Sequence, residues 1–281
     1  MSKVRIALLQ LVSSQQIEIN LPRVAELSER AVSEGAEALF LPENFAALAH
    51  PNPRAIGDQE CSREGPVRSF LSGLAQSSRC WVFAGTCPIA ETPGGESVAG
   101  NRVRAASLVL NPSGQEVARY DKIHMFDVDV EDNHRRYRES DTFEPGTETV
   151  TVDTPFGRVG LSVCYDIRFP ELYRELFLRR ADFIAVPSAF TVTTGKAHFQ
   201  LLMRARAVEN CCYTIAACQG GVHDSGRQTY GHSMVCDPWG DVVGELDQGE
   251  ELLIVDIDTE LQDRLREEMP FRQQLRLLPA D

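Results

Sequence analysis

Apolar and polar positions alternate at the start of the chain in a way that predicts a strand, a helix and a second strand. The apolar runs over residues 4–10 and 38–41 are typical of buried strands. Residues 20–34 between them predict a helix, with Asn20 as its N-cap and Gly35 as its stop signal. The apolar positions at helical spacing are Leu21, Val24, Leu27 and Ala31. This order indicates a βαβ unit, which joins two parallel strands.

Three turn sequences predict β-hairpins further along the chain. They are Asn-Pro-Ser-Gly at 111–114, Thr-Pro-Phe-Gly at 154–157 and Asp-Pro-Trp-Gly at 237–240, each between β-rich flanks. Proline presets the backbone for such turns and glycine accepts positive φ. Further strands are predicted over residues 81–89, 213–217 and 252–257.

The segment around Cys164 predicts a strand, a sharp bend and a helix. The strand covers residues 159–163, the helix runs from about 170 to 180, and another strand follows at 183–186. Cys164 is therefore expected at the bend. A polar amphipathic helix is predicted from about residue 259. The alternation of strands and helices indicates an α/β fold, and no repeat or linker divides the chain, so we expect a single domain over residues 1–281.

Charge and hydropathy exclude two classes of partner. The formal net charge of −13, without a cluster of Lys and Arg, argues against a nucleic-acid partner, whose phosphates an acidic surface repels. No segment approaches the ~20 apolar residues of a membrane span. The first apolar run is broken by Gln10 and lacks the cleavage site of a signal peptide. We therefore expect a cytoplasmic protein that binds neither nucleic acid nor membrane.

The cysteines and histidines do not predict a metal or disulfide framework. The eight cysteines lack paired CxxC spacing, and we expect them to be reduced and mostly structural, including the neighbours Cys211 and Cys212. No HxxxH or HExxH spacing is present, so no metal or cofactor is expected. His124 is expected to form hydrogen bonds within the loop that carries Lys122. The other histidines considered are His198, His223 and His232.

Three potentially reactive side chains each lie at or just after a predicted strand. They are Glu43, Lys122 and Cys164. In α/β proteins such positions gather at one edge of the sheet and form sites. Taken alone, a cysteine after a strand is more often a small buried hydrophobe than a nucleophile. The other two residues favour the catalytic interpretation.

The segments around these residues resemble the signatures of the nitrilase superfamily of carbon-nitrogen hydrolases. They read LFLPENF at 39–45, YDKIHMFD at 120–127 and GLSVCYDIRFPEL at 160–172, in the family's order. The resemblance covers nearly the whole chain. It implies a four-layer α-β-β-α sandwich, a small-molecule amide substrate, no cofactor, and a homodimer or larger homo-oligomer.

By this resemblance, Cys164 is the nucleophile, Glu43 the general base, and Lys122 the cation that stabilises the oxyanion. The chemistry agrees, because a thiol with an ordinary pKa of about 8.5 is little ionised at neutral pH and gains from a nearby base. A fixed ammonium and a backbone N–H can stabilise the charge that develops on the amide oxygen. The natural N–H donor is that of Tyr165, which follows the nucleophile at the bend.

The resemblance also points to a second glutamate between the lysine and the cysteine. Glu139, in RYRESDTFEPG at 136–146, stands at its expected place. Its expected task is to orient Lys122 and the substrate amide electrostatically. The alternative is a solvated glutamate in a charged loop, since Glu131, Glu144 and Glu148 lie nearby.

Three residues are candidates for substrate binding. Arg168 either presents its planar guanidinium to a substrate carboxylate or forms a structural ion pair with Asp166 or Glu171. Phe190 and Thr194 follow the next strand and border the same cleft if the family fold holds; otherwise they pack the loop.

The segment over residues 187–240 resembles the deaminated glutathione amidase branch of the superfamily. PSAF, RARAVEN, AACQGG with a following histidine, YGHSM and DPWG carry this resemblance, and ω-amidases tend to have glycine where Ser188 stands. One departure is Phe199, where tryptophan is common. The branch implies hydrolysis of deaminated glutathione to 2-oxoglutarate and cysteinylglycine, a metabolite-repair reaction. The alternatives are an ω-amidase acting on 2-oxoglutaramate, or another superfamily amidase or N-acyltransferase.

Overall fold

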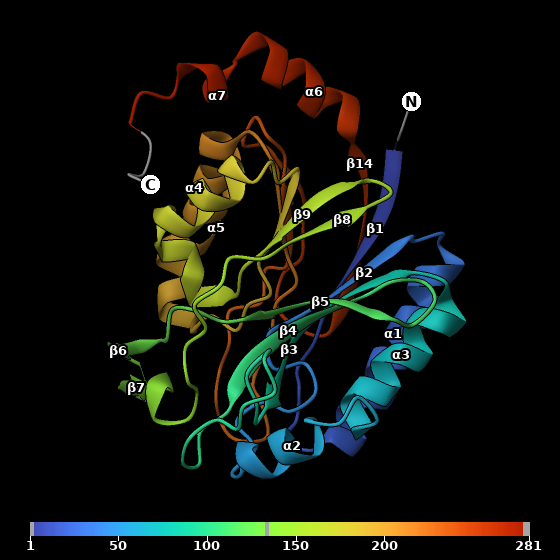
Figure 1. Cartoon of the computed structure of the whole chain (residues 1–281), viewed down its shortest axis with the longest axis vertical. Helices are drawn as coiled ribbons and strands as arrows, with labels where there is room; N and C mark the ends of the chain where they lie inside the picture. Colours follow the sequence, from blue (N-terminus) through green and yellow to red (C-terminus); the bar gives the residue numbers. More distant parts are fainter. Residues whose placement is uncertain (1–2, 133–134, 278–281) are drawn as a thin grey trace.

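The computed structural model describes residues 3–132 and 135–277, and two six-stranded sheets form its centre (Figure 1). The first sheet has the strand order β14-β1-β2-β3-β4-β5. Its strands are β1 (Lys3–Gln10), β2 (Ala38–Leu41), β3 (Trp81–Ile89), β4 (Arg104–Leu110), β5 (Glu116–Asp121) and β14 (Glu251–Asp258). The parallel pairing of β1 with β2 confirms the βαβ unit at the start of the chain.

The second sheet repeats this plan, with the strand order β13-β12-β11-β10-β9-β8. Its strands are β8 (Thr151–Thr154), β9 (Gly157–Leu161), β10 (Phe183–Ala185), β11 (Tyr213–Ala216), β12 (Met234–Cys236) and β13 (Val242–Glu245). The antiparallel pairs β4–β5, β8–β9 and β12–β13 confirm the three predicted hairpins.

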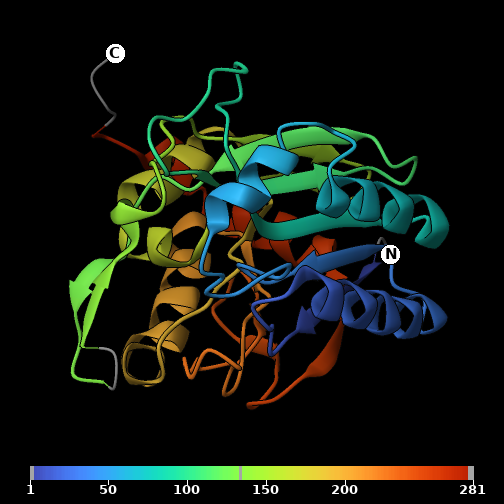
Figure 2. The same cartoon turned by 90° about the horizontal axis from the view of Figure 1, so that it is seen from below.

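Helices cover the outer face of each sheet, which confirms the four-layer α-β-β-α sandwich (Figure 2). On the first sheet lie α1 (Ile17–Ser33) and α3 (Pro66–Ser78), and on the second lie α4 (Pro170–Leu178) and α5 (Val192–Asn210). The remaining helices are α2 (Pro53–Gln59), α6 (Thr259–Glu268) and α7 (Phe271–Gln274). The segment predicted as a terminal helix is α6. No helix in the described ranges is long and apolar enough to cross a membrane.

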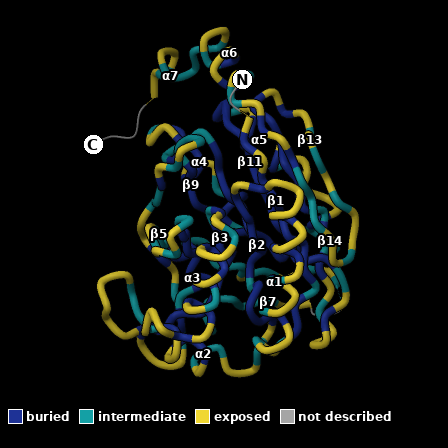
Figure 3. The backbone as a smooth tube through the Cα atoms, turned by 90° about the vertical axis from the view of Figure 1, so that its right-hand side faces the viewer, coloured by how far each residue is buried: buried dark blue, intermediate teal, exposed yellow. Residues whose placement is uncertain are grey.

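Side-chain alternation along the strands builds two separate cores. In β1, Ile6 and Leu8 face the second sheet, whereas Ala7 and Leu9 face α1 and α3. Successive strand residues point to opposite faces, so a strand buried on both sides reads as a continuous apolar run. Figure 3 shows the result, with buried strands inside and exposed residues on the outer surfaces of the helices.

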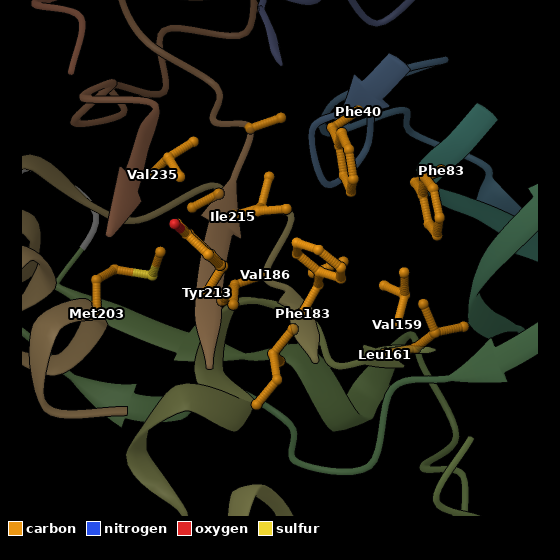
Figure 4. Packing of buried hydrophobic residues seen from close by; sticks show 14 of the residues in the cluster. Phe40, Phe83, Val159, Leu161, Phe183, Val186, Met203, Tyr213, Ile215 and Val235 are labelled. Atoms are coloured by element: carbon orange, nitrogen blue, oxygen red, sulfur yellow. The ribbon is translucent and has the colours of Figure 1, made fainter. Parts of the chain in front are cut away.

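Aromatic rings from both sheets belong to one core cluster (Figure 4). Phe40 of β2 stacks on Phe83 of β3, with ring centroids 4.5 Å apart. Phe183 of β10 stacks on Tyr213 of β11 at 5.8 Å. Burial of one such side chain stabilises the folded state by roughly 1.5–3 kcal/mol. The strand ends that carry the candidate site therefore project from a well-packed sandwich.

The prediction that Asn20 caps the first helix was wrong. The helix begins at Ile17 and its N-cap is Gln16. Asn20 lies inside it, 2% exposed, and its side-chain amide donates to the carbonyl oxygens of Ser14 and Ala46. The sequence alone does not distinguish an asparagine that donates hydrogen bonds to buried loop carbonyls from one that caps a helix.

Candidate active site

Glu43 lies just past the end of β2, on a segment held from both sides. The next residue, Asn44, has a positive φ of 56° and donates its amide to the hydroxyl of Thr86. The side chain of Gln219 donates to the carbonyl oxygen of Glu43 at 3.1 Å. Glu43 is only 4% exposed. These bonds fix the backbone, so the carboxylate has a defined position.

Lys122 follows β5 and is buried against two carboxylates. Its Nζ lies 2.8 Å from Oε1 of Glu43 and 2.8 Å from both oxygens of Glu139. Glu139 opens a short 3-10 turn, η1 (Glu139–Asp141), and also accepts the amide of Phe126. Glu139 is therefore an ion-pair partner of Lys122 rather than a solvated loop residue.

Cys164 lies at the bend between β9 and α4. It has a left-handed backbone with φ of 51°, and its amide donates to the carbonyl oxygen of Pro187. A positive φ at a non-glycine residue is uncommon and is found where function constrains the backbone. The short helix η2 (Cys164–Arg168) starts there, so Tyr165 follows the thiol in the first turn.

Asp166 connects the cysteine bend with the segment that carries Lys122. This fully buried carboxylate accepts the hydroxyl of Tyr120 at 2.7 Å and the amide of Val163 at 2.8 Å. It also accepts the amide of His124, whose ring nitrogen Nδ1 lies 2.7 Å away. His124 thus binds the cysteine bend, and the expectation that it bonds within its own loop was wrong.

Burial and charge set the resting protonation of the site. Burial raises the pKa of the Cys164 thiol well above its ordinary value, and the carboxylate of Glu43 adds to the rise while Lys122 opposes it. Burial favours a lower pKa for Lys122, but Glu139 and Glu43 outweigh it and hold that pKa well above its usual range. Burial also raises the pKa of Glu139, against the attraction of Lys122. These directions favour a neutral Cys164 thiol beside a Lys122 ammonium.

The thiol, the lysine and both glutamates open into one cavity of about 280 Å³. Its walls combine rings, three arginines and small polar groups. The lining residues are Glu43, Asn44, Lys122, Phe126, Arg136, Tyr137, Arg138, Glu139, Thr142, Phe143, Cys164, Tyr165, Ala189, Phe190, Thr191, Thr194 and Arg227. A cavity of this size suits a small molecule.

The structure places Phe190 and Thr194 in the cavity wall. Arg168 is not among the described residues that form this wall. The guanidinium of Arg168 lies over the rings of Tyr165 and Phe190, and its Nη2 is 3.2 Å from Nδ1 of His198. The alternative of an ion pair with Asp166 or Glu171 was wrong, because the carboxylate of Asp166 is occupied by Tyr120, His124 and Val163. Arg168 supports two residues of the wall.

Sequence reasoning missed the other arginines of the cavity. Arg136 and Arg138 belong to β7 (Arg136–Arg138), which pairs with β6 (Asp127–Asp129) in a small ribbon at the cavity. Arg227 comes from a loop 63 positions beyond Cys164 in the chain. Only the fold brings these segments together; no spacing in the sequence does so.

The histidines are dispersed over the structure. His223 is buried between the carbonyl oxygen of Ser13 and the hydroxyl of Thr229, and His232 pairs with Glu245. Within residues 3–132 and 135–277, no group of three His, Cys, Asp or Glu side chains is arranged to hold a metal ion.

Comparisons with known proteins identify the family of this chain. The family profile described as carbon-nitrogen hydrolase matches residues 5–267. The chain is 38% identical to the deaminated glutathione amidase of Yersinia enterocolitica, over 100% of this chain and 96% of that protein. It is 41% identical to the enzyme of that name from Synechocystis, over 95% and 96%.

The fold is similar to that of solved members of the same group. Nit3 of Saccharomyces cerevisiae, described as a member of branch 10 of the nitrilase superfamily, superposes with a TM-score of 0.84 at 32% identity, over 98% of this chain and 97% of that one. Sequence, fold and the buried arrangement of Glu, Lys and Cys lead to the same assignment. The chain belongs to the carbon-nitrogen hydrolase family of the nitrilase superfamily.

Proposed function

We propose that this protein is an amidase that hydrolyses deaminated glutathione to 2-oxoglutarate and cysteinylglycine through a thioester on Cys164. The observation that carries the proposal is the buried Lys122 ammonium, shared by Glu43 and Glu139 in the cavity that contains the thiol. The substrate class rests on the similarity to deaminated glutathione amidases over the whole chain.

In the acylation step, Glu43 takes the proton of the Cys164 thiol while sulfur bonds to the amide carbon. Because the resting thiol is neutral, this transfer has to accompany the attack. The amide oxygen becomes an oxyanion, which the ammonium of Lys122 and the N–H of Tyr165 stabilise. Glu43 then donates the proton to the departing nitrogen, the carbon–nitrogen bond breaks, and the amine product leaves.

In the deacylation step, the same groups act on water. Glu43 accepts a proton from water as its oxygen attacks the thioester carbon, and the same two donors stabilise the second oxyanion. The carbon–sulfur bond breaks and the thiolate regains its proton from Glu43. Glu139 holds Lys122 through both steps, since the ammonium contacts both of its oxygens at 2.8 Å.

The substrate is tested by product analysis. Deaminated glutathione and 2-oxoglutaramate are offered side by side, with and without an added amine as acyl acceptor. We expect a higher kcat/KM for deaminated glutathione, with 2-oxoglutarate and cysteinylglycine in equal amounts. A preference for 2-oxoglutaramate would identify an ω-amidase instead, and transfer of the acyl group to the amine in preference to water would identify an N-acyltransferase.

The nucleophile is tested by intact-mass spectrometry with a slowly hydrolysed substrate. The wild-type protein should accumulate one acyl adduct that maps to Cys164, and Cys164→Ala should keep the fold and lose hydrolysis. The other seven cysteines serve as internal controls, because each is an unpaired thiol in the same chain. An adduct on any of them, or full activity of the variant, would reject the mechanism.

We further propose that the protein works in the cytoplasm as a homodimer and removes a damaged metabolite. Eight free thiols suit a reducing compartment. The dimer is proposed to form across the outer surface of α5, where Leu201, Val208 and the neighbouring Trp239 are exposed.

A further inference from the structure

Three arginines line the cavity, and they differ in whether a carboxylate of the protein already neutralises their charge. Arg138 pairs with Asp129 at 3.0 Å and donates to the carbonyl oxygens of Val128 and Tyr137. Arg136 is exposed and has no carboxylate partner among the described residues. Arg227 is half-buried and also lacks a carboxylate partner there. Two of the three positive charges are thus available to a ligand.

The side chain of Arg227 is held in place by contacts, but one of its hydrogen-bond donors has no acceptor in the described part of the chain. Its Nη2 donates to the carbonyl oxygen of Ala189, which adjoins Phe190 in the cavity wall, and its Cζ lies 5.9 Å from the ring centre of Tyr137. Its Nε is shielded from solvent and has no acceptor within reach among the described residues. A buried donor without an acceptor is unfavourable. An anion that enters the cavity provides the acceptor and the opposite charge together.

The catalytic cluster itself cannot supply the attraction for an acidic substrate. The ammonium of Lys122 is shared by the carboxylates of Glu43 and Glu139, and the whole chain has a net charge of −13. An acidic substrate is therefore repelled unless positive charge is concentrated on the cavity wall. Arg227 and Arg136 provide that charge.

We propose that Arg227 binds a carboxylate of the substrate, with Arg136 adding positive charge to the same cavity. This inference rests on the proposed function, because deaminated glutathione has carboxylates on both sides of the reacting amide. It replaces Arg168 as the specificity residue. Arg168 is turned to ring faces and His198, whereas Arg227 reaches the cavity itself.

The test compares Arg227→Gln and Arg227→Lys with the wild-type protein on three amides. These are deaminated glutathione, 2-oxoglutaramate with a carboxylate on the acyl half only, and a neutral amide of similar chain length. Lost charge-assisted hydrogen bonds should lower kcat/KM of Arg227→Gln by roughly tenfold to a hundredfold on acidic amides, mainly through KM. Arg227→Lys should restore part of this loss, and the neutral amide should be turned over as in the wild type.

The pattern of losses also tells which carboxylate is bound. If kcat/KM falls on both acidic amides, Arg227 binds the carboxylate of the acyl half. If it falls on deaminated glutathione alone, Arg227 binds the carboxylate of the amine half. Arg174→Gln is the matched control, because Arg174 also lies over a ring, Phe177, but on α4 outside the cavity wall. It should leave all three rates unchanged.

An equal loss on acidic and neutral amides, or none on any, would overturn the role of Arg227. A thermal melt of each variant shows whether the bond to Ala189 only supports the fold, in which case Tm falls and the three substrates suffer alike. If the wild-type protein fails on deaminated glutathione, the proposed function fails. The Arg227 inference is then still decided by the 2-oxoglutaramate and neutral-amide pair, or by any acidic and neutral pair that the protein hydrolyses.

Discussion

Each charged residue of the site changes the acid–base behaviour of the others. Glu43 raises the pKa of the Cys164 thiol, so it opposes the thiolate at rest, and in the proposed mechanism it accepts the thiol proton during attack. Lys122 opposes that rise and is itself kept protonated by the two glutamates. The raised pKa favours a neutral Cys164 thiol, and a neutral thiol is less reactive than a thiolate.

Glu43→Gln separates thiolate formation from proton transfer. Removing the carboxylate should lower the pKa of Cys164, because Glu43 contributes to its rise, and the thiolate should form at lower pH than in the wild type. Turnover should nevertheless fall by about 10²-fold or more, since the base is lost. Ultraviolet titration of the thiolate and steady-state kinetics measure the two effects. An unchanged kcat would rule out Glu43 as the base.

Lys122→Ala should affect both activity and stability. Loss of an oxyanion donor costs about 3 kcal/mol of transition-state stabilisation. The variant also leaves two buried carboxylates facing each other, and an uncompensated buried charge costs roughly 3–5 kcal/mol of folding free energy. The measurements are kcat/KM and denaturant unfolding.

The pH dependence of this instability follows from the carboxylates that remain. Without the ammonium, repulsion raises one folded-state carboxyl pKa above its unfolded value of about 4.3. The folded state then holds the proton more tightly, so the destabilisation is present above the raised pKa and is lost as pH falls through it. Glu139→Gln added to Lys122→Ala should relieve it at neutral pH. Equal stability of the single and double variants would contradict a shared buried charge.

The sequence was sufficient for residues that lie in continuous motifs, and insufficient for those that only the fold assembles. Glu43, Lys122 and Cys164 follow predicted strands and lie in segments that resemble the family's signatures, so the resemblance predicted their meeting, although β9 belongs to a different sheet from β2 and β5. Arg136 and Arg227 come from a ribbon and a distant loop without a chemical signature of their own. Arg168 was predicted to bind either a substrate carboxylate or a structural ion-pair partner, and the structure places its guanidinium over the rings of Tyr165 and Phe190.

Among the elements, the ends of β2 and β3 approach each other closely beside Glu43. A Cβ on Gly85 would overlap the carbonyl oxygen of Pro42, the residue before Glu43. Gly85 therefore permits this approach by its lack of a side chain. The position of Glu43 therefore depends on a glycine of a neighbouring strand.

Gly85→Ala should therefore displace the base and strain the sheet. We expect a loss of about 1–3 kcal/mol in unfolding free energy from overpacking, together with a lower kcat. The matched control is Gly73→Ala in α3, where an added Cβ meets nothing within 4 Å. Replacing a helical glycine there should add up to about 1 kcal/mol of stability and leave kcat unchanged. The same kcat in both variants would disprove the positional role of Gly85.

Elements with regular patterns could be predicted, and α5 shows why others could not. No helix was predicted over Val192–Asn210, because its buried face includes polar side chains. Arg206 is 6% exposed, donates to the carbonyl oxygen of Ile167, and lies over the ring of Tyr173. Asn210 is also buried at its end. Tertiary partners satisfy these groups, and the apolar spacing that identifies a helix is interrupted.

On the scale of the whole molecule, the outer surface of α5 has no covering layer among the described residues, and it carries exposed apolar side chains among polar ones such as Lys196, Gln200 and Arg204. Leu201 is 69% exposed and Val208 42%, and seven residues of separation place them on one face of the helix. Trp239 is 59% exposed and precedes Gly240 in the chain. The carbonyl oxygen of Gly240 accepts a hydrogen bond from Nε of Arg204, which lies in α5 between Leu201 and Val208. An apolar patch of this kind marks an interaction surface.

We propose that a second copy of the chain binds this surface, and a single substitution can test this. A closed dimer uses the same patch on both subunits, so one substitution changes the interface twice. Leu201→Asp places two buried carboxylates in it, and we expect the protein to sediment as a monomer at concentrations at which the wild type is a dimer.

The matched control is Val117→Asp, because Val117 is 43% exposed on β5, at the opposite edge of the other sheet from β14. It introduces the same charge at an exposed apolar position outside the α5 surface and should leave the dimer intact. Both variants should retain hydrolysis per chain, since neither Leu201 nor Val117 is among the residues that line the cavity. A wild-type protein that sediments as a monomer, or equal dissociation of both variants, would remove α5 as the dimer surface. Such a result leaves the proposed chemistry of Cys164 unaffected, because that proposal rests on the ion pairs of Lys122 with Glu43 and Glu139 and not on the α5 surface.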